Sequence, residues 1–202
     1  MYVSHVLYPV RVLGPGDRIG IWFSGCEHHC PGCSNPELWD PQPQQEIAGG
    51  KLLDMIRAVA SAHPVSGFTL TGGDPFLQPE ALRELLPALR EIADDILVYT
   101  GYDYAGLVRQ YPDLVSQIPV VIDGPYIEER NTNCPLRGSD NQNLIYRDAE
   151  TEARYTAYLS RYENRIQNFS VRGGIVSVGI HRPGYKRQLK QILEKRGIET
   201  DE

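Results

Sequence analysis

Three cysteines lie within eight residues, in the segment Cys26-Glu-His-His-Cys30-Pro-Gly-Cys33. Their spacing is C-x3-C-x2-C. A secreted disulfide-bonded protein usually spreads its cysteines along the chain, so a cluster of three favours a metal site. Iron–sulfur clusters of the 4Fe-4S type are usually held by four thiolates, one on each iron. Three thiolates therefore predict a cluster with one iron left open to the amino and carboxylate groups of a bound molecule.

Two other interpretations of this segment remain. Zinc could be bound by the three cysteines together with His28 or His29, although closing a tetrahedron within one short loop would be cramped. The three thiols could also be buried or reactive without any metal. The histidines are otherwise expected to be solvated or to support a cluster from outside, with His28 donating a hydrogen bond to a sulfur. Cys134 has no companion cysteine and is expected to be an ordinary thiol rather than a fourth ligand.

A second motif, Gly72-Gly73-Asp74-Pro75, follows a predicted strand. Two glycines allow the backbone to approach a ligand closely, because no Cβ is in the way. Asp74 could accept a hydrogen bond from the ammonium group of that ligand. The alternative is a plain turn in which Asp74 caps the local backbone.

Both motifs come at the ends of predicted strands. Apolar runs predict strands at residues 18–24, 67–71, 95–100 and 118–122, and helical spacing predicts helices at 51–62, 79–92 and 104–110. Pro87 falls inside the second helix and should kink it or remove one backbone hydrogen bond. Alternating strands and helices are typical of parallel βαβ units, whose functional groups gather at the carboxyl ends of the strands. The chain is shorter than the ~250 residues of a complete eight-stranded barrel. We therefore expect an α/β fold that is an incomplete (β/α) barrel, with parallel strands and outer helices.

The pattern weakens after Gly124. Residues 125–150 predict a long polar loop, which could be functional given its length. Residues 165–180 could form one or two strands around a turn at Gly173-Gly174. Residues 183–196 predict a closing helix with one basic face.

Composition narrows the class of protein. A chain of 202 residues with 41% hydrophobic residues can close one core, so we expect a single domain over residues 1–202, with a core at roughly 11–150 and a closing segment at 151–202. The net charge of −6 is too mild for a nucleic-acid binder. No apolar run approaches the roughly 20 residues of a membrane span, and the first residues lack a signal-peptide pattern. A cytoplasmic location without membrane partners is therefore expected.

Gly25 with the three cysteines, and Gly72 to Pro75 after the second strand, resemble the signature of radical S-adenosylmethionine (SAM) enzymes. A closer resemblance is to the anaerobic ribonucleoside-triphosphate reductase activating proteins. It rests on five segments in order: Trp22 to Cys26 (WFSGC), Cys30 to Pro36 (CPGCSNP), Leu38-Trp39, Ile122 to Pro125 (IDGP) and Leu136 to Gln142 (LRGSDNQ). The resemblance covers roughly residues 11–150, and residues 150–202 are longer than a minimal activase would need.

This resemblance implies two cofactors and a set of contacts. Cys26, Cys30 and Cys33 would hold a 4Fe-4S cluster, and SAM would bind its fourth iron. The SAM contacts implied or suggested by position are Gly32, Ser34, Gly72, Gly73, Asp74, Tyr99, Thr100 and Asp123. A polar loop expected to order the substrate or partner contains Arg137, Ser139, Asn141 and Gln142. The alternative for this loop is an ordinary surface turn, and that for Tyr99, Thr100 and Asp123 is a solvated turn at the strand ends. No catalytic side chain is expected beyond the cluster and the bound SAM.

The resemblance also implies a target. Reductive cleavage of SAM would give a 5′-deoxyadenosyl radical that takes a hydrogen atom from a glycine of a glycyl radical enzyme, an anaerobic ribonucleotide reductase. The electron would come from a donor such as flavodoxin or ferredoxin. One alternative keeps this chemistry and changes the target to a peptide or small metabolite. Another is a Cys3His zinc protein without enzyme activity.

Overall fold

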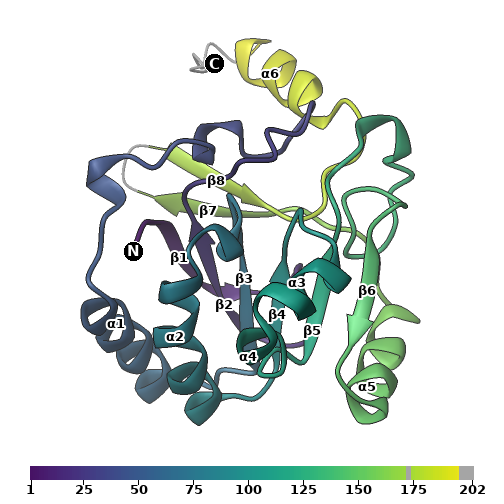
Figure 1. Cartoon of the computed structure of the whole chain (residues 1–202). Coiled ribbons are helices and arrows are strands. Elements are labelled where there is room, and N and C mark those ends of the chain that lie inside the picture. Colours follow the sequence, from purple (N-terminus) through teal and green to yellow (C-terminus); the bar gives the residue numbers. More distant parts are fainter. Residues whose placement is uncertain (172–173, 196–202) are drawn as a thin grey trace.

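The computed structural model describes residues 1–171 and 174–195, and its centre is a six-stranded sheet (Figure 1). The strands are β1 (Val3–Val10), β2 (Arg18–Phe23), β3 (Gly67–Gly72), β4 (Ile96–Tyr99), β5 (Val120–Asp123) and β6 (Asn143–Tyr146). They lie side by side in chain order. β2 to β5 run parallel, whereas β1 pairs antiparallel with β2 and β6 antiparallel with β5. The predicted parallel βαβ units are therefore confirmed in a mixed α/β sheet with antiparallel edges.

Four helices cover one face of this sheet (Figure 1). They are α1 (Gly49–Ala62), α2 (Pro79–Ile92), α3 (Tyr104–Gln110) and α4 (Pro112–Val115). Alternate residues of a strand point to the same face, so Ile19 and Ile21 of β2 are fully buried against this layer together with Leu52 of α1 and Leu82 of α2. Because helices follow β2, β3 and β4, the chain returns each time to start a parallel strand, and the carboxyl ends of β2 to β5 meet at one edge.

The other face is covered by elements from the end of the chain. These are α5 (Ala149–Leu159) and the antiparallel hairpin of β7 (Gln167–Val171) and β8 (Gly174–Val178), whereas α6 (Tyr185–Lys195) lies beyond the carboxyl ends of the strands (Figure 1). Tyr155 of α5 is fully buried against Leu97 of β4 and Ile122 of β5. Val178 of β8 is buried in a cluster with Trp22 of β2. No helix among the described residues combines the length and apolar character needed to cross a membrane.

The structure corrects part of the prediction for the second half of the chain. Residues 125–150 are not one long loop, because they contain a 3-10 helix at Glu128–Arg130, strand β6 and the start of α5. Strand β6 has only four residues, and its pairing with β5 rather than an apolar alternation defines it. The hairpin and the closing helix are confirmed, with Gly174 as the first residue of β8; Gly173 and Arg196 lie outside the described residues. α2 continues through Pro87.

A buried ion pair joins the amino ends of the parallel strands, opposite the carboxyl ends. Arg18, at the start of β2, is 0% exposed, and its Nη1 lies 3.2 Å from Oδ2 of Asp95, which is 8% exposed and precedes β4. Arg18 also donates to Oγ1 of Thr69 at 2.8 Å, and the hydroxyl of Tyr155 donates to Asp95 at 2.8 Å. A buried charge is tolerated when it is paired and fully hydrogen-bonded. This network ties β2, β3, β4 and α5 together far from the candidate site.

Candidate functional site

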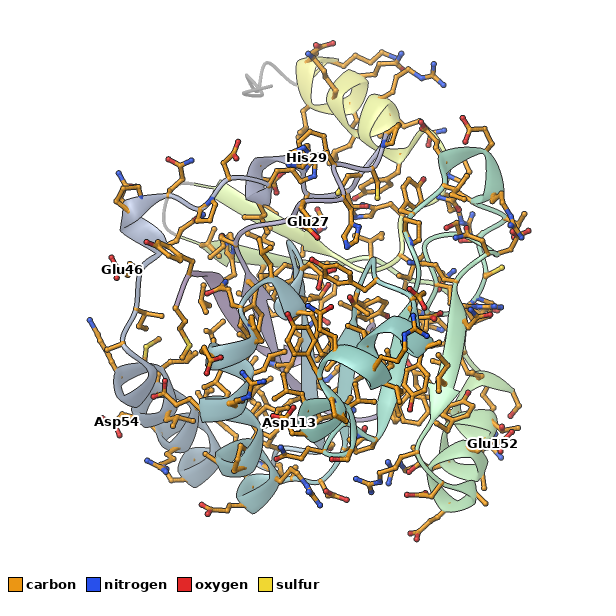
Figure 2. The ribbon with its side chains drawn as sticks, in the orientation of Figure 1. Glu27, His29, Glu46, Asp54, Asp113 and Glu152 are labelled. Atoms are coloured by element: carbon orange, nitrogen blue, oxygen red, sulfur yellow. The ribbon has the colours of Figure 1, made fainter. Side chains whose placement is uncertain are left out.

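A cavity of about 850 Å³ lies at the carboxyl ends of the parallel strands. Each of the loops that follow β2, β3, β4 and β5 contributes residues to its lining, and so does a segment from β8 into α6. In Figure 2, Glu27 and His29 mark the cysteine loop near α6, whereas Asp54 of α1 and Glu152 of α5 lie toward the other end of the molecule. The topology thus brings together the motifs that the sequence places at strand ends.

The three cysteines occupy one loop that begins where β2 ends, and all three line the cavity. The amides of Gly25 and Cys26 donate to the carbonyls of Leu38 and Trp39 at 2.8 and 2.9 Å, which fixes both sides of the loop. Gly25 has a φ of +103°, a left-handed conformation that favours glycine. A Cβ there would also lie 2.8 Å from the side chain of Leu77. Glycine is therefore required where the strand turns into the cysteine loop.

Backbone amides surround the cysteine sulfurs. Burial raises the pKa of the Cys26 thiol, while the amides of His28 and His29 donate to its sulfur and oppose that shift. Burial likewise raises the pKa of the Cys30 thiol, opposed by the amide of Tyr126 from the loop after β5. The amide of Asn35 lies 3.4 Å from Sγ of Cys33. Amide donors favour the charged form of sulfur, so this donor set fits an iron–sulfur cluster, whose potential depends on hydrogen bonds to its sulfurs.

Both histidines of the loop contact other groups. Nε2 of His28 lies 3.1 Å from Oδ2 of Asp74, and this hydrogen bond raises the pKa of His28. The ring of His29 packs on Trp39 with centroids 4.8 Å apart. The described part of the chain contains no group of three or more His, Cys, Asp or Glu side chains gathered around one metal-ion position. The sequence did not predict this contact of His28 with a carboxylate, and the hydrogen bond expected from His28 to a cluster sulfur stays a prediction.

Gly72 and Gly73 join the end of β3 to the cysteine loop. Neighbouring backbone leaves no space for a side chain at either position. A Cβ on Gly72 would lie 2.4 Å from the carbonyl oxygen of Phe23, and a Cβ on Gly73 would lie 2.3 Å from the carbonyl oxygen of Gly25. The amides of Gly73 and Asp74 donate to the same two carbonyls, both at 2.8 Å. The two glycines therefore hold the β3 loop directly against the start of the cysteine loop.

Asp74 is 1% exposed, and its carboxylate is surrounded by donors from the protein itself. Oδ1 accepts from the amide of Phe76 at 3.0 Å, and Oδ2 accepts from the amide of Gly101 at 2.8 Å. The hydroxyl of Thr100 lies 3.1 and 3.0 Å from the two oxygens, and His28 completes the set. A carboxylate has about four acceptor positions. Asp74 thus links the ends of β3 and β4 to the cysteine loop, and its predicted hydrogen bond to a ligand ammonium group stays a prediction.

The remaining predicted SAM contacts divide into two groups. Gly32, Ser34, Tyr99 and Thr100 line the cavity. Burial raises the pKa of Tyr99 well above its ordinary value, and its hydroxyl donates to the carbonyl of Leu136 at 2.8 Å. Asp123 is not among the lining residues: it accepts from the amides of Tyr104 and Asn143 at 2.9 and 3.2 Å, and so ties β5 to α3 and β6.

The side chains of the polar loop that was predicted to order a substrate form hydrogen bonds within the loop and to neighbouring backbone. Gln142 is the only one of its four predicted residues that lines the cavity. Its amide oxygen accepts from the amide of Gly138 at 2.8 Å, and its nitrogen donates to the carbonyl of Gly124 at 2.9 Å. Arg137 donates to the carbonyl of Gln142 at 3.0 Å. Ser139 accepts from the amide of Ile127 at 3.1 Å, and Asn141 donates to the carbonyl of Pro125 at 2.8 Å. These side chains fix the loop beside the cysteines.

Some residues at the cavity were not predicted. Glu128 packs against the loop, since a Cβ on Gly32 would lie 2.6 Å from its carboxylate. Asn131 and the segment 177–185 also line the cavity, as do Arg187 and Gln188 of α6. These residues lie outside the recognisable motifs, and only the basic character of the last helix pointed to them.

Comparison with known proteins defines the class. The family described as a 4Fe-4S single cluster domain matches residues 12–145, which contain the cysteine loop and all parallel strands. Named relatives narrow the class further. An anaerobic ribonucleoside-triphosphate reductase-activating protein from Escherichia coli strain K12 is 32% identical over 148 residues, covering 68% of this chain and 94% of that protein. Two proteins of the same name are also similar. The one from Haemophilus influenzae is 36% identical and covers 69% of this chain and 94% of its own length; the one from Enterobacteria phage T4 is 31% identical and covers 68% and 90%. The chain belongs to this family of reductase-activating proteins.

Proposed function

We propose that this protein is a radical SAM enzyme that installs a glycyl radical in an anaerobic ribonucleotide reductase. The observation that carries the proposal is the convergence of three cysteines from one loop and the Gly72–Asp74 loop on one cavity, in a chain of the activating-protein family. Cys26, Cys30 and Cys33 hold a 4Fe-4S cluster, and SAM lies beside the Gly72–Asp74 loop.

When bound, the reduced cluster supplies the one electron that breaks a carbon–sulfur bond of the SAM sulfonium, giving methionine and a 5′-deoxyadenosyl radical. The protein itself positions the cofactors and encloses them in the cavity. Backbone amides at the sulfurs of Cys26 and Cys30 oppose the effect of burial, which raises the pKa of both thiols, and the amide of Asn35 lies 3.4 Å from Sγ of Cys33. Asp74 keeps the β3 and β4 loops in register with the cysteine loop. This chemistry would remove a hydrogen atom from the Cα of the partner's glycine, leaving 5′-deoxyadenosine and a glycyl radical.

Three further assignments go with this function. We infer that the open six-stranded sheet is an incomplete barrel in which residues 1–202 act as one domain, because the parallel strands converge on the cavity and helices cover their outer face. We assign the protein to the cytoplasm, where its reductase partner would work. A flavodoxin or ferredoxin supplies the electron.

The test is anaerobic reconstitution of the full chain with iron and sulfide. Dithionite and SAM should then yield 5′-deoxyadenosine, and addition of the reductase should produce a glycyl radical doublet in electron paramagnetic resonance. Protein that takes up zinc in place of iron and sulfide would exclude the function. Formation of 5′-deoxyadenosine without a radical on the reductase would retain the cofactor chemistry and move the target to a peptide or small metabolite.

A further inference from the structure

The chain continues beyond the part that matches the 4Fe-4S domain family, which ends at residue 145. α5, the β7–β8 hairpin and α6 all follow that point. The Escherichia coli relative is matched over 94% of its own length, but over only 68% of this chain. These elements therefore lie outside the part of the chain that matches the 4Fe-4S domain family.

Part of that structure forms one side of the cavity. Residues 177–185, Arg187 and Gln188 line it, and we call residues 177–188 the C-terminal wall. Figure 1 shows the hairpin and α6 across the end of the sheet where the cysteine loop lies. Gly179 has a φ of +138°, and a Cβ there would lie 2.3 Å from the carbonyl oxygen of Arg165. Glycine is therefore needed where the wall leaves β8.

The wall is fixed at several points. Val178 is 2% exposed and packs with Trp22 and Leu38 beside the cysteine loop. The side chain of Asn131 donates to the carbonyl of His181 at 3.0 Å, which ties the wall to the loop after β5. Gln167 at the start of β7 donates to the carbonyl of Pro9 in β1 at 2.7 Å. These contacts hold the wall, and the hairpin from which it continues, against the sheet and the loop after β5.

The charge of this segment differs from that of the chain. Residues 164–193 contain six Arg or Lys and no Asp or Glu, although the whole chain has 26 acidic and 20 basic residues. Two exposed arginines of the wall, Arg182 and Arg187, line the cavity. Guanidinium groups bind carboxylates through paired hydrogen bonds. A patch of one charge at a cleft also speeds the approach of an oppositely charged partner.

We propose that the C-terminal wall is a docking surface for an acidic segment of the protein partner, the segment that carries the glycine into the cavity. The proposal rests on the function proposed above. Arg182 and Arg187 bind carboxylates flanking that glycine, while the inner end of the cavity, at the cysteines and Gly72, holds the cofactors. The wall thus determines which glycine-bearing segment reaches the radical.

The test is charge reversal in the full-length, reconstituted protein. The double variant Arg182→Glu/Arg187→Glu is compared with Arg57→Glu/Arg109→Glu, which changes the net charge equally at exposed positions of α1 and α3 outside the cavity. The wall variant should associate with the reductase roughly tenfold more slowly at low salt, with a correspondingly lower initial rate of glycyl radical formation. Its affinity for SAM and its 5′-deoxyadenosine formation without the reductase should equal those of the wild type.

Three results would overturn the proposal. If the wall and control variants associate with the reductase and form the radical at equal rates, the wall does not bind the partner. A loss of SAM affinity in the wall variant would assign the arginines to the cofactor. A difference between the variants that persists at high salt would exclude an electrostatic origin. Wild-type protein that forms no radical in the same assay would refute the proposed function instead. Should the glutamates lower the melting temperature, Arg182→Gln/Arg187→Gln replaces them and must still slow association.

Discussion

The buried carboxylate of Asp74 provides the sharpest test of how the site is built. In Asp74→Asn the side chain keeps its shape, but one oxygen becomes an NH2 group that faces donors of the protein. In the wild type, the amide of Gly101 donates to Oδ2 at 2.8 Å, and His28 contacts the same oxygen. If the NH2 group takes the place of Oδ2, both groups lose this acceptor. A buried donor left unsatisfied costs roughly 1–3 kcal/mol, and hydrogen bonds to a charged group are worth roughly 1.5–3 kcal/mol. We expect the free energy of unfolding to fall by about 3 kcal/mol, a large share of the 5–15 kcal/mol typical of a domain.

The assay is urea unfolding of the metal-free protein, followed by circular dichroism in the absence of SAM. Asp54→Asn is the matched control, because Asp54 is 81% exposed on α1 and its ion pair with Arg57 spans 3.9 Å. Its unfolding free energy should change by no more than about 0.5 kcal/mol. If Asp74→Asn leaves the metal-free protein as stable as the wild type and only weakens SAM binding, the carboxylate serves the ligand and the internal role assigned to it is wrong.

A double-mutant cycle extends this test to β4. Thr100 donates to the Asp74 carboxylate from 3.0 Å, so Thr100→Val should cost about 1.5–3 kcal/mol in the wild-type background. In the Asp74→Asn background the same substitution should cost clearly less, because the charged acceptor is already absent. Additive costs would show that the two side chains act independently.

Three further predictions concern other parts of the chain. Cys33→Ser should abolish binding of stoichiometric iron and sulfide on reconstitution, whereas Cys134→Ser, outside the cavity lining, should bind the wild-type amount; iron and sulfide analysis compares the two. Asp95→Asn should lower the unfolding free energy by about 3–5 kcal/mol, because it leaves the buried Arg18 without its counter-charge; a change below about 1 kcal/mol in urea unfolding would contradict this. Burial lowers the pKa of His5 from 6.5, so the unfolded chain binds a proton first and stability falls as the pH drops below about 6.5. His5→Gln should therefore flatten the pH dependence of the melting temperature in that range, and an unchanged slope would exclude His5 as its source.

The sequence allows the cofactor-binding motifs to be predicted, but not the contacts that their side chains make. The cysteine loop and the Gly72–Asp74 loop were found because residue type and spacing within a few positions suffice, and β2 to β5 were found because they are continuous apolar runs. Strand β1 was not predicted, and β6 was taken for loop; both are edge strands defined by their antiparallel pairing with a neighbour. Contacts distant in sequence could not be foreseen. Gln167 and Pro9, for example, are 158 residues apart and meet only because the hairpin packs on the sheet.

The role of Asp74 shows the same limit. Its place in the motif predicted a contact with a ligand, and its residue type fits that contact. The donors that surround it come from His28 before the motif and from Thr100 and Gly101 after it. Only the fold places these three around one carboxylate, because it brings the ends of β2, β3 and β4 together. The polar loop at Arg137 to Gln142 is a similar case, since its side chains satisfy one another and the backbone of Gly124 and Pro125.

The position of Glu128 has a consequence for electron transfer. Its carboxylate occupies the space that a side chain would fill at Gly32, which lies in the sequence between Cys30 and Cys33, two of the proposed cluster ligands. A negative charge near a bound cluster favours the oxidised form, which carries the less negative charge, and therefore lowers the reduction potential. Glycine at this position thus does more than allow a turn, because it leaves space for the Glu128 carboxylate beside the cysteine loop. A cluster held by this loop would need a more strongly reducing electron donor, and once reduced it would be a stronger one-electron reductant.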